Sequence, residues 1–162
     1  MDQVVSGPAP TKLVFLSQIL TYPVGSKIRF LGCVSRYNTA SGRLTLHHNY
    51  NYNQNVNKRN SQVSKVEVDI NLLLGDISYT SLQIGVWLNI FGYIREEVPD
   101  DRCGVNWSES SRRNNEKSEH ILTDRPVYVQ AVTVLPAGPV RIGEYENILR
   151  DMQQVERRVY DD

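Results

Sequence analysis

One long alternating segment interrupted by a glycine restricts the possible folds of this chain more than any other feature. In residues 27–37, Ile28, Phe30 and Val34 fall on one side of an extended strand, and Gly32 interrupts the run. A glycine inside a strand usually marks a bulge or a sharp bend. A strand shared between two sheets of a small barrel requires such a bend. The segment therefore predicts a bent strand in a closed β-sheet.

Four further segments have strand character. Residues 43–47 alternate with Leu44 and Leu46 inward and follow a turn at residues 38–42, which predicts a hairpin. Residues 62–70, 86–95 and 126–135 are the third, fourth and fifth strands. The leucine-rich residues 71–76 are too few for an amphipathic helix and predict a short helix or capped turn. With a helix at the end, this order is typical of an all-β OB-fold, a five-stranded Greek-key barrel.

The C-terminal residues 141–162 predict an amphipathic helix that begins just after Gly138-Pro139. Its opposite face carries Glu146, Arg150, Gln153, Gln154 and Arg157. A stripe of this width needs a partner surface, which can lie on its own sheet or on another protein. Both alternatives stay open at this point. The apolar stripe comprises Ile142, Tyr145, Ile148, Leu149, Met152, Val155 and Val159.

The length and composition are those of one domain with a real core, because the chain has 162 residues of which 40% are apolar. We expect a mobile leader at residues 1–12 and a single domain at residues 13–160. At its start, residues 13–16 should lead into a helical turn, capped by Ser17, that plugs one end of the core. Two polar insertions are expected at about residues 48–62 and 96–125.

Charge and cysteine content exclude several classes of protein. The formal net charge is zero, which argues against a strong stand-alone DNA binder. Cys33 and Cys103 lack the spacing of a zinc site, and no secretory signal is visible, so we expect an intracellular, reduced protein. No apolar run approaches the ~20 residues that span a membrane.

The sequence shows no pattern typical of catalysis or of metal binding. We therefore expect no enzyme, no metal, no cofactor and no small-molecule substrate. His47 and His48 are adjacent, so on a strand they point to opposite faces and cannot hold a metal together. The segment Gly138–Gly143 has the glycine spacing of a phosphate loop, but Glu144 and Tyr145 stand where lysine and serine or threonine are required. No nucleophile and base form a recognisable constellation.

Candidates for nucleic-acid contact lie in the first insertion and on the fourth strand. The insertion is rich in asparagine and contains Tyr50, Tyr52, Lys58 and Arg59, which fit base stacking and phosphate contact or simply an unconstrained polar loop.

The fourth strand has two apolar faces. Tyr93 and Arg95 could stack and bind phosphate, whereas Trp87 and Phe91 suit a position under the terminal helix or a partner. On the third strand, carboxylates at positions 67 and 69 argue against a DNA floor there.

Several of these segments, in the same order, resemble one family. They are residues 24–37 (VGSKIRFLGCVSRY), the hairpin arm at 43–46 (RLTL), residues 86–94 (VWLNIFGYI) and the closing helix at 145–160. Together they are similar to the fungal-type small OB-fold subunit, Ten-one (Ten1), of the telomere-capping CST (Cdc-Stn-Ten) complex. The resemblance covers roughly residues 13–160 with the insertions removed, and both long loops are enlarged relative to compact members.

The resemblance implies a non-enzymatic nuclear protein of the chromosome's telomeric region. It would form a heterodimer with the larger OB-fold subunit Stn-one (Stn1), beside a third large CST subunit. Its role would be to support single-stranded telomeric DNA binding, telomere end protection and telomerase restraint. The alternative is a stand-alone single-stranded nucleic-acid-binding OB protein or a small replication protein A-like subunit.

The helix and the resemblance together give two sets of predicted site residues. The predicted partner-binding residues are Tyr145, Ile148, Leu149, Met152, Val155, Arg157, Val159 and Tyr160. The predicted nucleic-acid-binding residues are Arg29, Arg36, Tyr50, Tyr52, Lys58, Arg59, Tyr93 and Arg95.

Overall fold

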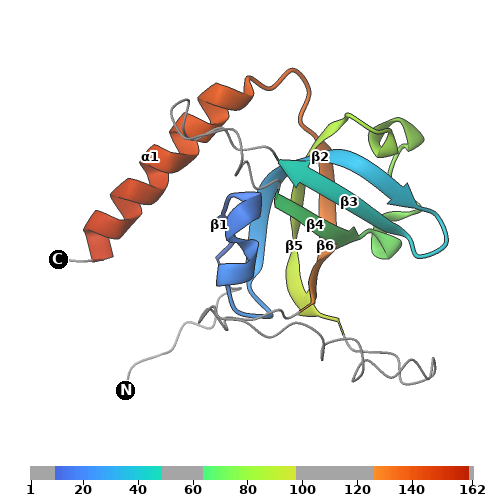
Figure 1. Ribbon diagram of the computed structural model, residues 1–162, viewed down its shortest axis with the longest axis horizontal. Coiled ribbons are helices and arrows are strands. Elements are labelled where there is room, and N and C mark those ends of the chain that lie inside the picture. The colour runs from blue at the N-terminus through green and yellow to red at the C-terminus, as the bar shows by residue number, and fades with distance from the viewer. Residues whose placement is uncertain (1–9, 49–63, 98–125, 161–162) are drawn as a thin grey trace, which may run out of the picture.

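Five long strands form where the sequence alternates apolar and polar residues (Figure 1). The structure, a computed structural model, describes residues 10–48, 64–97 and 126–160. The strands are β2 (Lys27–Asn38), β3 (Arg43–His48), β4 (Ser64–Asp69), β5 (Trp87–Glu96) and β6 (Val127–Pro136), and a short β1 (Lys12–Leu13) precedes them.

The strands close into a barrel. They follow the order β1-β2-β3-β4-β6-β5, and β5 pairs back onto β2. The β4–β6 contact is parallel, and the β2–β3, β3–β4, β5–β6 and β2–β5 pairs are antiparallel. This connectivity is that of the five-stranded Greek-key OB barrel, so the predicted fold class is confirmed.

Strand β2 is shared between two neighbours, as its sequence predicts. Its first part, Lys27–Cys33, pairs with β5, and its second part, Cys33–Asn38, pairs with β3. The register shift lies between Val34 and Arg36 and not at Gly32. Gly32 provides room instead, because a Cβ atom there would lie 3.0 Å from the Cβ of Leu46. The bend is therefore confirmed, while its placement at the glycine is wrong by a few residues.

A short 3-10 helix, η1 (Leu16–Thr21), closes one end of the barrel. It inserts Leu16 and Ile19 into the interior cluster, which confirms the predicted plug. The predicted cap at Ser17 is wrong. The helix begins after Phe15, because Leu16 must already be helical for it and Ile19 to enter the core together. The side chain of Gln18 accepts a 2.9 Å hydrogen bond from the Phe15 amide and supports this turn.

The connection from β4 to β5 contains two short 3-10 helices, η2 (Asn71–Leu73) and η3 (Tyr79–Leu82). The first confirms the short helix predicted for the leucine-rich segment, and the second was not predicted. Ser78 caps η3 by accepting from the Thr80 amide. Leu82 enters the interior cluster, and Leu73 packs against it.

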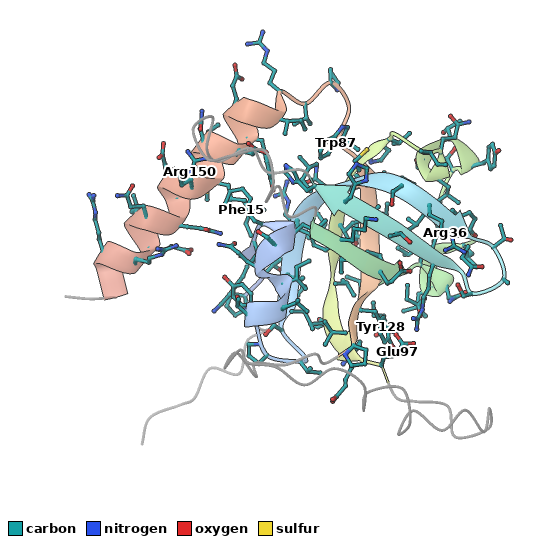
Figure 2. All side chains as sticks on the ribbon, in the orientation of Figure 1. Phe15, Arg36, Trp87, Glu97, Tyr128 and Arg150 are labelled. Atoms are coloured by element: carbon teal, nitrogen blue, oxygen red, sulfur yellow. The ribbon has the colours of Figure 1, made fainter. Side chains whose placement is uncertain are left out.

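The helix α1 (Ile142–Tyr160) lies on the outside of the barrel, on the same side as η1 (Figure 1). Phe15, Leu31 and Leu149 are buried, yet none of them belongs to the cluster inside the barrel. Figure 2 shows Phe15 between α1 and η1. These side chains make a second, thin apolar layer between the barrel wall and the helix. In the described part of the chain, no helix has the length and apolarity to cross a membrane.

Candidate partner and nucleic-acid interfaces

One face of α1 is fixed to the barrel. Leu149 is only 1% exposed, and Ile142 and Tyr145 are half-buried. Burial raises the pKa of the Tyr145 phenol, and the nearby Arg29 charge and the Leu31 backbone offset part of this rise. We call this side of the helix the inner face.

A buried polar pair joins the inner face to the end of β3. His48 Nε2 lies 2.9 Å from Glu146 Oε1, and the two side chains are 4% and 11% exposed. The other ring nitrogen, Nδ1, is 3.3 Å from the Leu31 carbonyl oxygen, and the ring meets Trp87 edge-on at 5.2 Å. Glu146 is therefore not on the solvent face, where the sequence pattern places it. His48 and Glu146 are 98 positions apart in the sequence, so no local sequence pattern predicts that they pair.

Gln153 also belongs to the inner face, although the pattern assigns it to the solvent side. Its amide nitrogen lies 2.9 Å from Gln18 Oε1 and 3.4 Å from the Leu13 carbonyl oxygen. The contact ties the middle of α1 to η1 and to the strand before it. Buried polar groups are costly unless they are hydrogen-bonded, so these contacts also fix the rotation of the helix about its axis.

The outer stripe of α1 is apolar and uncovered. It consists of Ile148, Met152, Val155 and Val159, which are 60%, 50%, 59% and 69% exposed. The residues follow one another at steps of four, three and four, so they lie in one row along the helix. Contiguous exposed apolar side chains of this kind mark interaction surfaces in soluble proteins.

The inner face and the outer stripe divide the predicted partner-binding residues. The structure places Tyr145 and Leu149 against the chain's own barrel, and it places the four stripe residues in solvent. Arg157 is also exposed, but it lies on the side of the helix away from the stripe. The side chain of Tyr160 lies outside the described residues. The helix therefore packs one face on its own domain, as the first alternative predicts, and leaves another face exposed, so binding to another protein stays a prediction.

Arginine and aromatic side chains alternate on the outer wall of β2 and β5. The Arg29 guanidinium lies over the Phe91 ring at 5.0 Å, and that of Arg95 lies over Tyr93 at 5.4 Å. Arg95 Nε also donates to Gln130 Oε1 at 3.1 Å. In the strand register Arg29 is opposite Phe91, and Tyr93 is the next outward residue of β5. We call Arg29, Phe91, Tyr93 and Arg95 the arginine–aromatic wall.

The wall brings together three of the predicted nucleic-acid residues and adds Phe91. Phe91 was not among the predicted contacts, because its position opposite Arg29 is apparent only when the β2–β5 register is known. Arg36 is separate: it lies opposite Thr45 on β3, and Figure 2 shows it on the far side of the barrel from α1. The predicted residues Tyr50, Tyr52, Lys58 and Arg59 fall outside the described residues.

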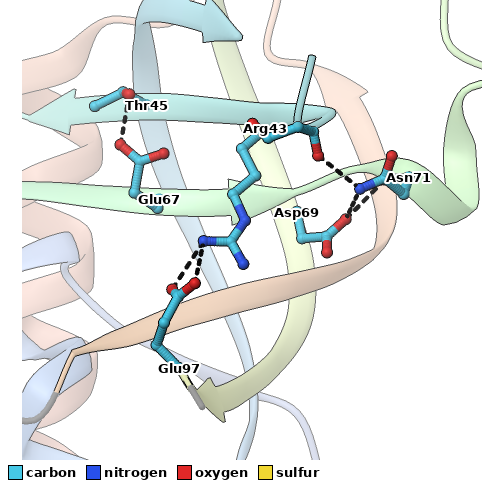
Figure 3. Close-up of polar contacts among 7 residues, drawn as sticks. Arg43, Thr45, Glu67, Asp69, Asn71 and Glu97 are labelled. Carbon is cyan, nitrogen blue, oxygen red and sulfur yellow. Dashed lines mark hydrogen bonds and ion pairs between the residues drawn. The ribbon is translucent and has the colours of Figure 1, made fainter. Parts of the chain in front are cut away.

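The outer face of β3 and β4 carries carboxylates that are already paired (Figure 3). Arg43 Nη1 donates to both oxygens of Glu97 at 2.8 Å, and its guanidinium lies 4.5 Å from the Tyr128 ring centre. The hydrogen bond that Arg43 donates to Glu97 is the main reason that the pKa of Arg43 is raised. Thr45 donates to Glu67 at 2.6 Å, and the Asn71 side chain donates to Asp69 at 2.9 Å. The carboxylates on this face argue against a DNA floor here, and that stays a prediction.

Residues that could hold a metal do not gather in the described ranges, where no group of three or more histidine, cysteine, aspartate or glutamate side chains occurs. Cys33 is a free, buried thiol, and burial raises its pKa.

Residues 1–150 match the family model described as telomere capping, CST complex subunit. The chain belongs to the Ten1 family. The protein ten1 of Schizosaccharomyces pombe is 34% identical to it over 86 residues, which are 53% of this chain and 67% of the yeast protein. The family predicted from the strand and helix segments is therefore confirmed.

Two solved structures show the same fold. The S. pombe Stn1–Ten1 complex contains a chain that matches with a TM-score of 0.55 and 24% identity, over 94% of this chain and 98% of that one. A structure of the S. pombe telomere capping protein Ten1 matches with the same TM-score and identity, over 90% and 99%. The match to the Ten1 family model ends within α1, so Met152, Val155 and Val159 lie beyond it.

Proposed function

We propose that this Ten1-family chain heterodimerises with a larger OB-fold subunit of the Stn1 type and acts within a CST complex that includes a third large subunit. There it supports single-stranded telomeric DNA binding, end protection and telomerase restraint. The role is non-enzymatic and belongs to the nucleus, at the telomeric region of the chromosome. One domain at residues 13–160, with a leader at 1–12 and polar insertions at about 48–62 and 96–125, performs it.

This proposal rests on the outer stripe of α1. The stripe is held in one orientation because the inner face is anchored by Leu149, the His48–Glu146 pair and Gln153. A rigid apolar row loses little conformational entropy when a partner covers it. We place the Stn1-type subunit on Ile148, Met152, Val155 and Val159, and Arg157 and Tyr160 are proposed partner contacts outside the stripe. The solved Stn1–Ten1 complex from S. pombe supports the pairing with a Stn1-type subunit.

The arginine–aromatic wall is the proposed DNA contact on this chain. Each aromatic ring there already has a cation over it, an arrangement that suits a stacked base beside a phosphate. The net charge of zero means that the wall acts together with a partner subunit and not alone. Arg36, Tyr50, Tyr52, Lys58 and Arg59 also remain proposed nucleic-acid contacts, and the last four lie outside the described residues.

The test is a pair of substitutions in the outer stripe, Met152→Glu with Val155→Glu. Both side chains are exposed in a single copy of the chain, so the melting temperature of the monomer should not change. In the heterodimer they would place two charges in an apolar contact, and losing such central contacts costs about 2–4 kcal/mol each. Two such losses amount to at least about 4 kcal/mol, so binding to the Stn1-type subunit should fall by at least about 700-fold in calorimetric titration.

The matched control is Asn147→Glu with Gln154→Glu, which adds the same charge to the polar side of the same helix. It should bind as the unmodified chain does. Co-elution of the stripe variant with the larger subunit would refute the proposal, and so would an unfolded stripe variant in circular dichroism.

A further inference from the structure

The outer stripe has the spacing of a coiled-coil seam. Steps of four, three and four place its residues at the alternating a and d positions of a heptad. One flank of this seam carries Asp151 and Arg158, which are both exposed and occupy the same heptad position in successive repeats. Glu156 occupies the flank on the other side and is also exposed. The two charges on the first flank thus have opposite signs.

This pattern is complementary to itself when two helices run antiparallel. About a two-fold axis at the centre of the stripe, Ile148 of one copy meets Val159 of the other, and Met152 meets Val155. All four stripe residues are then covered. The same arrangement brings Asp151 of each copy beside Arg158 of the other, so two opposite-charge pairs form at once. A C2 contact requires such a self-complementary patch.

If the two helices ran parallel, like charges would face each other. In a parallel coiled coil the flank residue of one helix faces the opposite flank of its neighbour, one turn further along. Asp151 would then face Glu156 of the second copy, and like charges would repel. The sequence of the stripe therefore favours one direction of pairing.

We propose that the chain, when its larger subunit is absent, forms an antiparallel two-fold homodimer through the outer stripe of α1. This inference rests on the proposed docking role of the stripe and adds a second, competing occupant. The homodimer and the heterodimer use the same residues, so they exclude each other. Self-association would cover the apolar row until the larger subunit displaces the second copy.

The test is sedimentation equilibrium of the full chain over a range of concentrations, alone and after charge reversal. The unmodified chain should dimerise reversibly. Arg158→Asp or Asp151→Arg alone creates two like-charge pairs, and the double reversal restores both attractions. An exposed ion pair changes a binding constant by roughly 1.4- to 5-fold. Each single reversal turns two such attractions into repulsions, so it should weaken dimerisation by about ten-fold. The double reversal should return it to within about two-fold of the starting value.

Lys65→Asp is the control, because it changes the net charge as Arg158→Asp does but is an exposed residue of β4 and not of α1. It should leave dimerisation unchanged. A monomeric unmodified chain at all concentrations would overturn the proposal, and so would a double reversal that fails to restore dimerisation. Addition of the Stn1-type subunit should convert the dimer into a one-to-one complex, and a complex that retains two copies of this chain would also overturn it.

The two proposals fail in different ways. If the chain binds the larger subunit through the stripe but never self-associates, the homodimer proposal is refuted and the proposed function stands. If the chain dimerises but does not bind the larger subunit, the proposed function is refuted and the homodimer proposal stands.

Discussion

Truncation of Leu149 should release α1 from the barrel, whereas truncation of Met152, one turn further along the same helix, should not. Leu149 is 1% exposed and fills the thin layer against the barrel wall. A buried Leu→Ala change costs about 2–5 kcal/mol. Because this layer lies near the surface and can partly collapse, we expect the lower end, about 2 kcal/mol. Met152 is half exposed, and Met152→Ala should change stability by less than about 0.5 kcal/mol.

The stability lost in Leu149→Ala should appear as local detachment of α1 from the barrel. A cost of about 2 kcal/mol raises the population of an undocked helix about 30-fold, because a detached element opens without unfolding the core. Hydrogen exchange measured by mass spectrometry should therefore accelerate in α1 of Leu149→Ala and stay unchanged in β2 and β5. Equal exchange in the two variants, or acceleration spread evenly over the barrel strands, would refute the division of α1 into an inner face and an outer stripe.

Two further predictions concern the wall and the buried phenol. Tyr93→Ala with Arg95→Ala should weaken single-stranded telomeric DNA binding by the heterodimer by about 1–3 kcal/mol per lost stacked base and should leave assembly intact; unchanged affinity at low salt in a filter-binding titration would show that the pair is structural. Burial raises the pKa of Tyr145 above its ordinary value of 10.0, so its contribution to stability is complete below that value and is lost as the pH rises through the folded-state pKa. Urea titrations above about pH 10 should therefore show a steeper fall in the free energy of unfolding for the unmodified chain than for Tyr145→Phe, and parallel curves would count against a buried phenol.

The strands were predictable because their signal is local. In β3, Leu44 and Leu46 alternate with polar residues, and any buried strand of that sequence must turn the same residues inward. The hairpin between β2 and β3 follows from the turn at residues 38–42 for the same reason. The barrel then follows from the number and order of such strands.

The surfaces of the site were less predictable because they depend on register and rotation. The helical pattern identifies a wide apolar stripe, but only the docked structure shows that Leu149 faces inward while Ile148 faces outward. Glu146 looks like a solvent residue until His48 is brought beside it. Phe91 likewise gains its role from Arg29 on the neighbouring strand. Contacts between distant segments carry no periodic signal in a single sequence.

The order of the elements along the chain has a consequence for synthesis. β6 pairs with both β4 and β5, so the barrel keeps open strand edges until residues 127–136 have left the ribosome. Because α1 follows β6, Leu31 and His48 are still uncovered when the barrel strands have been made. Domains generally fold as their N-terminal parts emerge, but here a helix made after every described strand both covers the wall and displays the stripe. The proposed docking surface is therefore made only after the barrel strands, and a nascent chain cannot be captured there before those strands exist.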